Sequence, residues 1–234
     1  MQSRRVALAV GVGLVYILAG KLGLDFAFLH VSATPVWPPA GIALAAFLLL
    51  GPRLWPIIFT GAFVINASTA GSLPTSLAIA AGNTLEAVVG AYLVTHFAGG
   101  VHTLDRPRDI FRFVVLAGMV STALSATIGV TSLAAAGYAR WADYGYIWLT
   151  WWLGDLAGDL IVAPLILLWA RPPSLGRLRA RWQEAVLLGL SVPVVGELVF
   201  GGLMPALPRN RPIAFLCIPI LLWTALRFGQ REAV

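Results

Sequence analysis

The chain has 234 residues, of which 59% are hydrophobic and only 11% are charged, and its formal net charge is +6. Soluble domains carry about 25% charged residues, so this composition excludes an ordinary water-soluble domain. The 16 basic residues are scattered between apolar stretches rather than gathered on one polar face, which argues against nucleic-acid binding.

Apolar stretches follow one another along the whole chain, separated by short turns rich in Pro, Gly and Arg. A membrane-spanning helix needs about 20 mostly apolar residues, because the hydrocarbon core is about 30 Å thick. The pattern predicts an all-α membrane protein, a single domain over residues 1–234 built as a bundle of about eight transmembrane helices. In chain order the predicted helices cover residues 6–24, 36–50, 57–70, 76–96, 110–136, 146–169, 184–204 and 213–227.

The second and third predicted helices, 36–50 and 57–70, are short and correspond to only about 22 Å of helix. They either cross the membrane or form a re-entrant hairpin that enters from outside. Both alternatives return the chain to the same side, so the orientation of every later helix is unaffected.

The arginines predict this orientation, because cytoplasmic loops carry an excess of Lys and Arg. With the N-terminus inside, the bundle has both termini in the cytoplasm and the arginines gather on the cytoplasmic side. The predicted cytoplasmic arginines are Arg4, Arg5, Arg53, Arg106, Arg108, Arg112, Arg171, Arg177, Arg179, Arg181, Arg227 and Arg231, and the predicted outer ones are Arg140, Arg209 and Arg211.

Four carboxylates fall within the predicted helices, near the middle of the membrane: Glu86, Asp155, Asp159 and Glu197. A charge at the bilayer centre costs at least about 2.5 to 3.5 kcal/mol, so these side chains are expected to face the bundle interior or a wet cavity. Asp155 and Asp159 are four residues apart and share one helix face. The sequence therefore predicts a polar interior.

Neighbouring residues extend this polar face. Asn83 shares a face with Glu86, and Trp151 continues the face of Asp155 by one turn toward the outside. Gly154 and Gly158 form a small-xxx-small pair, which lets a neighbouring helix approach closely. The sixth predicted helix is therefore expected at the centre of the bundle.

Two interpretations of the acidic interior remain open. The functional one is a site for a cation, an amine or protons, with Trp37, Trp151 or Trp152 as aromatic walls for cation–π contact. The structural one is that the carboxyls are interhelical hydrogen-bond partners, some of them permanently protonated. The candidate ligand-binding residues are Glu86, Asp155, Asp159, Asn83, Trp151, Trp152, Trp37 and Glu197.

The sequence carries no recognised catalytic motif and no metal-ligand pattern, and it names no cofactor. Lys21 and Asp25, four residues apart at the end of the first predicted helix, are expected to form an ion pair at the membrane interface.

An ordered set of motifs over almost the whole chain resembles the bacterial membrane-associated sensor domain family MASE1. No single motif is specific, and the order and spacing of the set carry the resemblance. The motifs are VWPPAGIA at Val36–Ala43, GPRLWP at Gly51–Pro56, Asn66, GNTLE at Gly82–Glu86, WWLGD at Trp151–Asp155 with Gly158 and Pro164, and RFG at Arg227–Gly229.

The resemblance implies a sensory module of the bacterial cytoplasmic membrane that regulates a cytoplasmic histidine kinase or diguanylate cyclase. The last helix would pass a change of helix packing to a dimeric output, so a homodimer is expected. The chain stops at Val234, just after the last predicted helix, so we expect either that the output domain has been cut away or that this is a stand-alone form.

Two other functions fit the same residues. A small transporter or channel is suggested by the interior acids and by the short, Gly- and Pro-broken second and third helices, which resemble discontinuous helices at transport sites. A membrane anchor or docking scaffold without a ligand would use the buried polar groups only to specify helix packing.

Overall fold

A computed structural model of the chain describes residues 2–25, 32–69, 71–171 and 182–200. Regular structure in these ranges is helical and contains no strand, which confirms the all-α prediction for this part of the chain. The chain falls into two compact units, Met1–Leu167 and Leu168–Val234. The predicted helix at 213–227 lies outside the described residues.

The first unit contains the first six predicted helices, with ends that shift by up to four residues. Short 3₁₀ turns lie in three of the connections, at Pro52–Leu54, Gly100–His102 and Trp141–Asp143. Two stretches, η3 and η5, are π-helical and continue the helices on either side. The helices are α1 (Gln2–Leu24), α2 (Pro38–Leu50), α3 (Trp55–Ala67), α4 (Leu73–Phe97), α5 (Pro107–Phe113), η3 (Val114–Ser121), α6 (Thr122–Ala135), α7 (Tyr144–Ala157), η5 (Gly158–Val162) and α8 (Ala163–Trp169).

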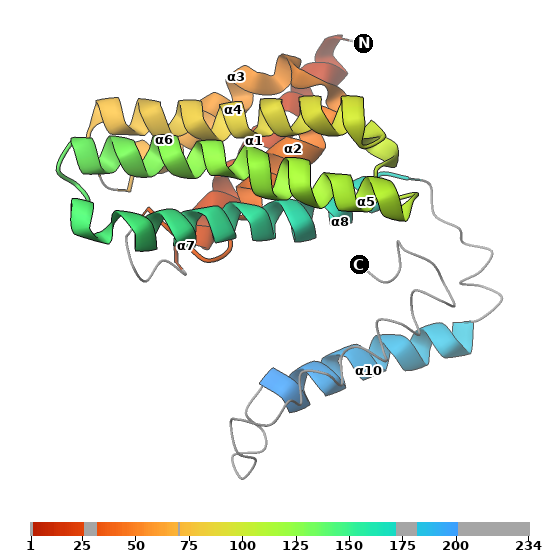
Figure 1. Ribbon diagram of the computed structural model, residues 1–234. Helices are drawn as coiled ribbons and strands as arrows, with labels where there is room; N and C mark the ends of the chain where they lie inside the picture. The colour runs from red at the N-terminus through yellow and green to blue at the C-terminus, as the bar shows by residue number, and fades with distance from the viewer. Residues whose placement is uncertain (1, 26–31, 70, 172–181, 201–234) are drawn as a thin grey trace. The chain divides into compact units, whose positions relative to one another are not determined.

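The first unit is a helical bundle in which α4, α6 and α7 lie side by side (Figure 1). Helices α1, α2 and α3 cover the other side of this row. α2 packs between α1, α4 and η5, and α3 packs between α1 and α4. The short helix α2 is therefore surrounded by longer ones.

Four described helical stretches are long and apolar enough to cross a membrane: Val6–Leu24, Leu73–Phe97, Pro107–Ala135 and Trp141–Trp169. α2 is also apolar but has only 13 residues, about 20 Å of helix. The four long stretches agree with four predicted spans, whereas the count of eight stays a prediction.

Local sequence signals explain where these helices begin. Proline, whose fixed φ suits the first helical turn, occupies one of the first two positions of α2, α3, α4 and α5. Ser72 precedes α4 and forms a capping box with Thr75, in which each side chain satisfies a backbone N–H of the other.

Lys21 closes the end of α3 rather than pairing with Asp25. Its ammonium group donates to the carbonyl oxygens of Ile65 and Ser68, at 3.3 and 3.4 Å, and lies 3.4 Å from the Thr69 hydroxyl. A cation is stabilised at a helix C-terminus, where carbonyl groups lack partners. The expected Lys21–Asp25 ion pair is therefore wrong.

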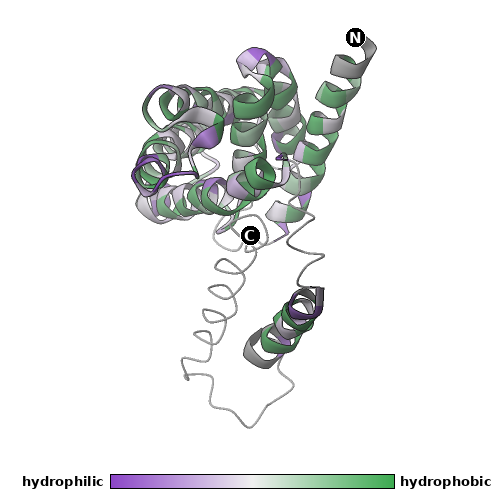
Figure 2. Cartoon of the chain, turned by 90° about the vertical axis from the view of Figure 1, so that its right-hand side faces the viewer, coloured by the Kyte–Doolittle hydropathy of each residue, from purple (hydrophilic) through white to green (hydrophobic). Residues whose placement is uncertain are grey.

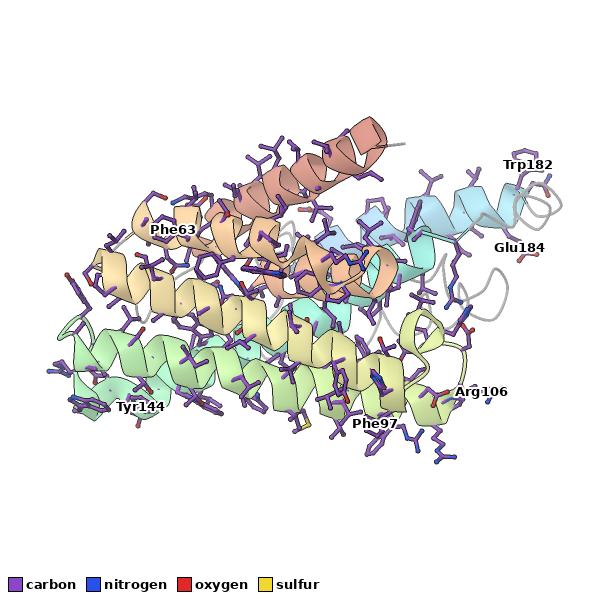
Figure 3. All side chains as sticks on the ribbon, turned by 90° about the horizontal axis from the view of Figure 1, so that it is seen from above. Phe63, Phe97, Arg106, Tyr144, Trp182 and Glu184 are labelled. Atoms are coloured by element: carbon purple, nitrogen blue, oxygen red, sulfur yellow. The ribbon has the colours of Figure 1, made fainter. Side chains whose placement is uncertain are left out.

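The two ends of the first unit differ in their side chains. Figure 3 shows Phe97 and Arg106 at one end and Tyr144 at the other. The Arg106 end is the one predicted to be cytoplasmic, and Arg112 there donates to the Phe97 carbonyl at 2.8 Å, capping α4. At the Tyr144 end, Arg140 forms an exposed ion pair with Asp143.

Helices α1 and α2 are packed very differently, and an apolar crevice separates them. Nine residues of α2, Pro39 to Phe47, are buried without interruption. α1 diverges from the other helices toward its N-terminus (Figure 2), and many of its large side chains are exposed, including Leu14 at 57%. The crevice has a volume of about 530 Å³ and is lined by residues such as Gly11, Val15, Ile42 and Leu49.

The described part of the second unit contains α10 (Trp182–Phe200), which corresponds to the predicted helix at 184–204. Pro193 lies inside it, and its first part, Trp182–Val195, is apolar but shorter than a full span.

Candidate functional site

The backbone before α2 enters the bundle as a non-helical segment, residues 32–37, alongside α7. Ala33 and Thr34 in this segment are 1% and 3% exposed, and the Trp37 N–H donates to the Gly154 carbonyl at 2.9 Å. Irregular backbone at membrane depth is tolerated only where protein or a water-filled cavity covers it. Ser32, Ala33, Thr34 and Trp37 of this segment are buried, whereas Val36 is 43% exposed, so protein covers most of the segment where α2 begins.

Three glycines make this close approach possible. A Cβ atom on Gly154 would collide with the Thr34 carbonyl oxygen, and one on Gly158 with the Trp37 carbonyl oxygen. Gly41 of α2 lies equally close to the Gly158 carbonyl. The predicted close neighbour of α7 is therefore the start of α2 together with the segment that precedes it.

A hydrogen-bonded relay crosses the bundle from α7 through α6 to α4. The Trp151 indole N–H donates to the Ser125 hydroxyl at 3.1 Å, and this hydroxyl donates to the Asn83 side-chain oxygen at 2.8 Å. All three side chains are buried. The relay therefore holds Asn83 in one orientation, with its NH₂ group, Nδ2, buried and without a partner among the described residues.

Three of the predicted carboxyls come together beside this relay. Glu86 of α4, Asp155 of α7 and Asp159 of η5 are exposed by 2%, 0% and 2%, and they interact electrostatically with one another. Glu86 Oε1, both oxygens of Asp155 and Asp159 Oδ1 have no hydrogen-bond partner among the described residues. The predicted acidic interior is therefore present in the fold.

No Lys or Arg among the described residues offsets the charge of these three carboxyls. Neighbouring carboxylates repel one another strongly in a medium of low dielectric constant, and an uncompensated buried charge is costly. The cluster is stable only when it holds protons or a polar partner. This is the chemical property that separates it from the rest of the apolar bundle.

Tyr16 completes the cluster and was not among the sequence candidates. It is 1% exposed, and its hydroxyl lies beside Asn83 and within electrostatic range of Glu86 and Asp155. One weak signal in the sequence points to it: Tyr16 is the only hydrogen-bonding side chain between Val6 and Gly20. Ser125 was also missed, because it is one of three serines and three threonines in its predicted helix, and such small polar residues are common in membrane helices.

A small cavity opens next to Asp155. It is lined by polar groups of the 32–37 segment and of Asn83 and Asp155, and it offers about 10 Å³ to the centre of a water molecule. One buried water needs about 10 to 15 Å³ by this measure. The cavity lining comprises Leu24, Ser32, Thr34, Trp37, Asn66, Asn83, Trp151 and Asp155.

The tryptophans predicted as aromatic walls take different positions. Trp37 and Trp151 line the cavity, and their rings also pack against Gly20 and Gly129. Trp152 lies elsewhere: its indole N–H donates to the Met119 carbonyl at 3.0 Å, and its ring stacks on Trp148.

Glu197, the fourth predicted carboxylate, belongs to α10 in the second unit, where its side chain is exposed. Its part in a ligand site stays a prediction. Among the described residues, no three His, Cys, Asp or Glu side chains are arranged to hold a metal ion. The cluster therefore differs from a metal centre in geometry, although it is rich in carboxyl oxygen.

Comparison with known proteins gives two matches that cover nearly the whole chain. The model of the MASE1 family matches residues 8–234. The probable diguanylate cyclase DgcE of Escherichia coli strain K12 is 26% identical over 96% of this chain, which spans about 20% of that protein's length. No solved structure matches the chain.

Proposed function

The chain belongs to the MASE1 family of membrane sensor domains, and from this premise we infer that it is the signal-input part of a bacterial signalling system. Its partner would be a cytoplasmic output domain, either attached to the chain or separate from it. The name of the Escherichia coli relative supports a diguanylate cyclase as one such output, with cyclic-di-GMP as the messenger. A histidine kinase is the other candidate.

The proposed setting is the bacterial cytoplasmic membrane, crossed by about eight helices with both termini in the cytoplasm. The gathering of arginines on one side supports this orientation. In a homodimer, the last predicted helix of each chain, at 213–227, would transmit a change of helix packing to the two output domains.

The buried acidic cluster is the observation that carries the sensing role. Glu86 of α4 and the pair Asp155 and Asp159 of the continuous α7–η5 helix come from two different helices, and their buried carboxyls have unused hydrogen-bonding capacity. A ligand shifts a conformational equilibrium only if it binds two states unequally. A cation, an amine or a proton at this junction would bind unequally to any two packings that change the spacing of the carboxyls.

The experiment is to join the chain to a diguanylate cyclase output domain and to measure cyclic-di-GMP in cells. Glu86→Gln and Asp155→Asn keep the shape of each side chain but remove the charge, so we expect them to fix the output at one level. Asp143→Asn is the control, because Asp143 lies in an exposed ion pair with Arg140. An unchanged response of both cluster variants, in protein of normal stability, would refute the sensing role.

A transporter or channel is the second candidate, favoured by the non-helical 32–37 segment that precedes a short helix inside the bundle. Unwound segments of this kind line substrate sites in transporters. Flux of a labelled cation or amine in proteoliposomes would favour transport, whereas a response of the output without flux favours sensing. A scaffold without a ligand predicts a third result, in which the carboxyl substitutions change stability but never the output.

A further inference from the structure

The crevice between α1 and α2 results from the way in which α1 packs. On one side α1 touches α3, where a Cβ atom on Gly13 would lie 2.9 Å from Ile57 Cγ2. On the side of the crevice, a Cβ atom on Gly11 would meet no described atom within 4 Å. Small residues such as Gly11 and Ala46 usually let membrane helices approach closely, but here they border open space. The crevice is therefore a feature of the backbone arrangement, which Figure 2 shows as the divergence of α1.

The lining and depth of the crevice suit a hydrocarbon chain. All the residues that line it are apolar, and its volume of about 530 Å³ falls within the range of about 300 to 1,000 Å³ that is usual for ligand pockets. Along α2 it extends from Ile42 to Leu50, which corresponds to about 12 Å of helix. One half of the hydrocarbon core of a membrane is about 15 Å thick. The crevice therefore matches one acyl chain of a single leaflet.

A second hollow continues the crevice and ends at a cation. It shares Leu8, Leu49 and Leu50 with the crevice, has a volume of about 600 Å³, and includes one charged residue, Arg53, in its lining. Arg53 lies in the 3₁₀ turn that follows α2, its side chain is exposed, and it forms no ion pair with a described residue. This turn is on the predicted cytoplasmic side. The two hollows thus form an apolar groove with a cation at its membrane-surface end.

The order of these groups favours an amphiphile with a negatively charged head. A helix of a second copy could cover the apolar part, but no acidic side chain lines either hollow to pair with Arg53. A phospholipid supplies both groups, because its acyl chain restores the dispersion contacts that open space lacks and its phosphate accepts from the guanidinium fork. Anionic lipids of the cytoplasmic leaflet are also attracted to basic residues at the membrane surface.

We propose that the α1–α2 crevice binds one anionic glycerophospholipid of the cytoplasmic leaflet, with an acyl chain between α1 and α2 and its phosphate on Arg53. None of the residues that line the two hollows belongs to the acidic cluster of Glu86, Asp155 and Asp159. The lipid site therefore goes beyond the proposed sensing role and does not depend on it. The bound chain fills the space between α2 and the part of α1 from Ala7 to Val15.

Native mass spectrometry tests the site on the full chain, released from nanodiscs that contain equal amounts of phosphatidylglycerol and phosphatidylcholine. We expect the wild-type chain to retain one phosphatidylglycerol under activation that removes phosphatidylcholine. Gly11→Phe places a ring in the crevice and is expected to abolish this retention. Gly145→Phe is the matched control, because a Cβ atom on Gly145 also meets nothing within 4 Å and Gly145 lies outside both hollows.

Arg53→Gln tests the headgroup contact and stays informative if Gly11→Phe folds poorly, because the Arg53 side chain is exposed. We expect it to lower the preference for phosphatidylglycerol over phosphatidylcholine by about two- to fivefold, as for the loss of an exposed ion pair. Arg53→Lys keeps the charge and is expected to keep most of the preference. Arg108→Gln is the control, since Arg108 is an exposed arginine on the same predicted side, outside both hollows.

Several results would overturn the proposal. Equal retention of the two lipids by the wild-type chain, or full retention of phosphatidylglycerol by Gly11→Phe, contradicts a specific site. An Arg108→Gln effect as large as that of Arg53→Gln indicates a general attraction of the basic surface instead. Phosphatidylglycerol with a diazirine on its acyl chain is expected to crosslink to α1 and α2. A dimer that Gly11→Phe converts to a monomer, without lipid crosslinks on α1, would assign the crevice to a second copy.

Discussion

Helices α1 and α2 lie next to each other and have exchanged the roles that their sequences suggest. α1 has the length and apolar character of a complete span, yet only 22% of its most apolar window is buried. α2 has 13 residues, fewer than the about 20 of a typical span, yet it is buried from Pro39 to Phe47. In an apolar bundle, therefore, the hydropathy of a helix indicates that it can contact lipid, whereas small residues determine which helix packs at the centre.

The largest expected effect comes from the glycines that admit α2. Gly158→Ala places a methyl group on the Trp37 carbonyl oxygen, so the backbones must separate. Overpacking typically costs about 1 to 3 kcal/mol, and a backbone collision belongs at or above the upper end of this range. We expect a loss of at least about 3 kcal/mol in unfolding experiments in mixed detergent.

Gly11→Ala in α1 is the matched control, because a Cβ atom at Gly11 meets nothing within 4 Å. Its effect is expected to stay within about 0.5 kcal/mol, as for substitutions away from packed contacts. Equal losses for the two glycine variants would remove the distinction between the helices.

Leucine truncation gives the next largest difference. Leu44 of α2 is 1% exposed and packs toward Gly90 of α4, whereas Leu14 of α1 is 57% exposed. Leu44→Ala leaves a cavity and is expected to cost about 2 kcal/mol or more. Leu14→Ala exchanges a lipid contact for a smaller one and is expected to be close to neutral in the same unfolding assay.

Removal of the relay hydroxyl is expected to have a moderate effect. Ser125→Ala leaves the Trp151 N–H and the Asn83 oxygen without their buried partner, which should cost about 1 to 2 kcal/mol. Thr127→Val is the control, since Thr127 accepts the Trp148 indole N–H at 3.0 Å between the same two helices on an exposed face. The control should lose less than half as much, and a larger loss there would show that burial is not the cause.

The smallest effect is expected for Lys21, the side chain of α1 that bonds to α3. Lys21→Met removes the cation from the C-terminus of α3 and should cost about 0.3 to 1 kcal/mol. Thermal unfolding at low and high salt checks this, because the wild-type advantage should shrink as salt screens the interaction.

The sequence predicts the helices of the first unit well, because their signals are local. Proline and glycine mark the turns, and the predicted ends at residues 24 and 50 coincide with those of α1 and α2. The carboxyl cluster also follows from local spacing, since Asp155 and Asp159 lie one helical turn apart. Lys21 shows the limit of such reasoning, because its partners lie 44 to 48 residues away, at the C-terminal end of α3 and just beyond it.

The centre of the bundle depends on contacts that no local pattern contains. All the helices of the first unit are apolar, so hydropathy alone does not identify α2 as the central one. Tyr16 and Ser125 reach the carboxyls only because α6 packs on α4 and α1 packs on α2 and α3, which themselves pack on α4; a single-helix pattern does not reveal these contacts. The glycine pair of α7 predicts a close neighbour but not that a non-helical segment would be part of it.

The π-helical stretches η3 and η5 set the angular phase of the two helices that contain them. Buried positions in the α7 helix recur every fourth residue, at Ile147, Trp151, Asp155, Asp159, Ala163 and Leu167. In a uniform α-helix each step of four overshoots a full turn by about 40°, so five steps would rotate Leu167 about 200° away from Ile147.

One π turn takes up an extra residue and removes about 100° of this rotation, which leaves a drift of about 100°, the width of one inward-facing stripe. The helix that contains η3 shows the same pattern, with a buried residue at every fourth position from Phe113 to Leu133. α4 is entirely α-helical, and its buried positions follow one another in steps that average 3.6 residues. These positions are Ser76, Ala80, Asn83, Ala87, Gly90 and Val94. Two of the three helices in the row thus have, on average, more residues per turn than the third. A helical wheel drawn at 100° per residue places the ends of those two on the wrong side of the molecule.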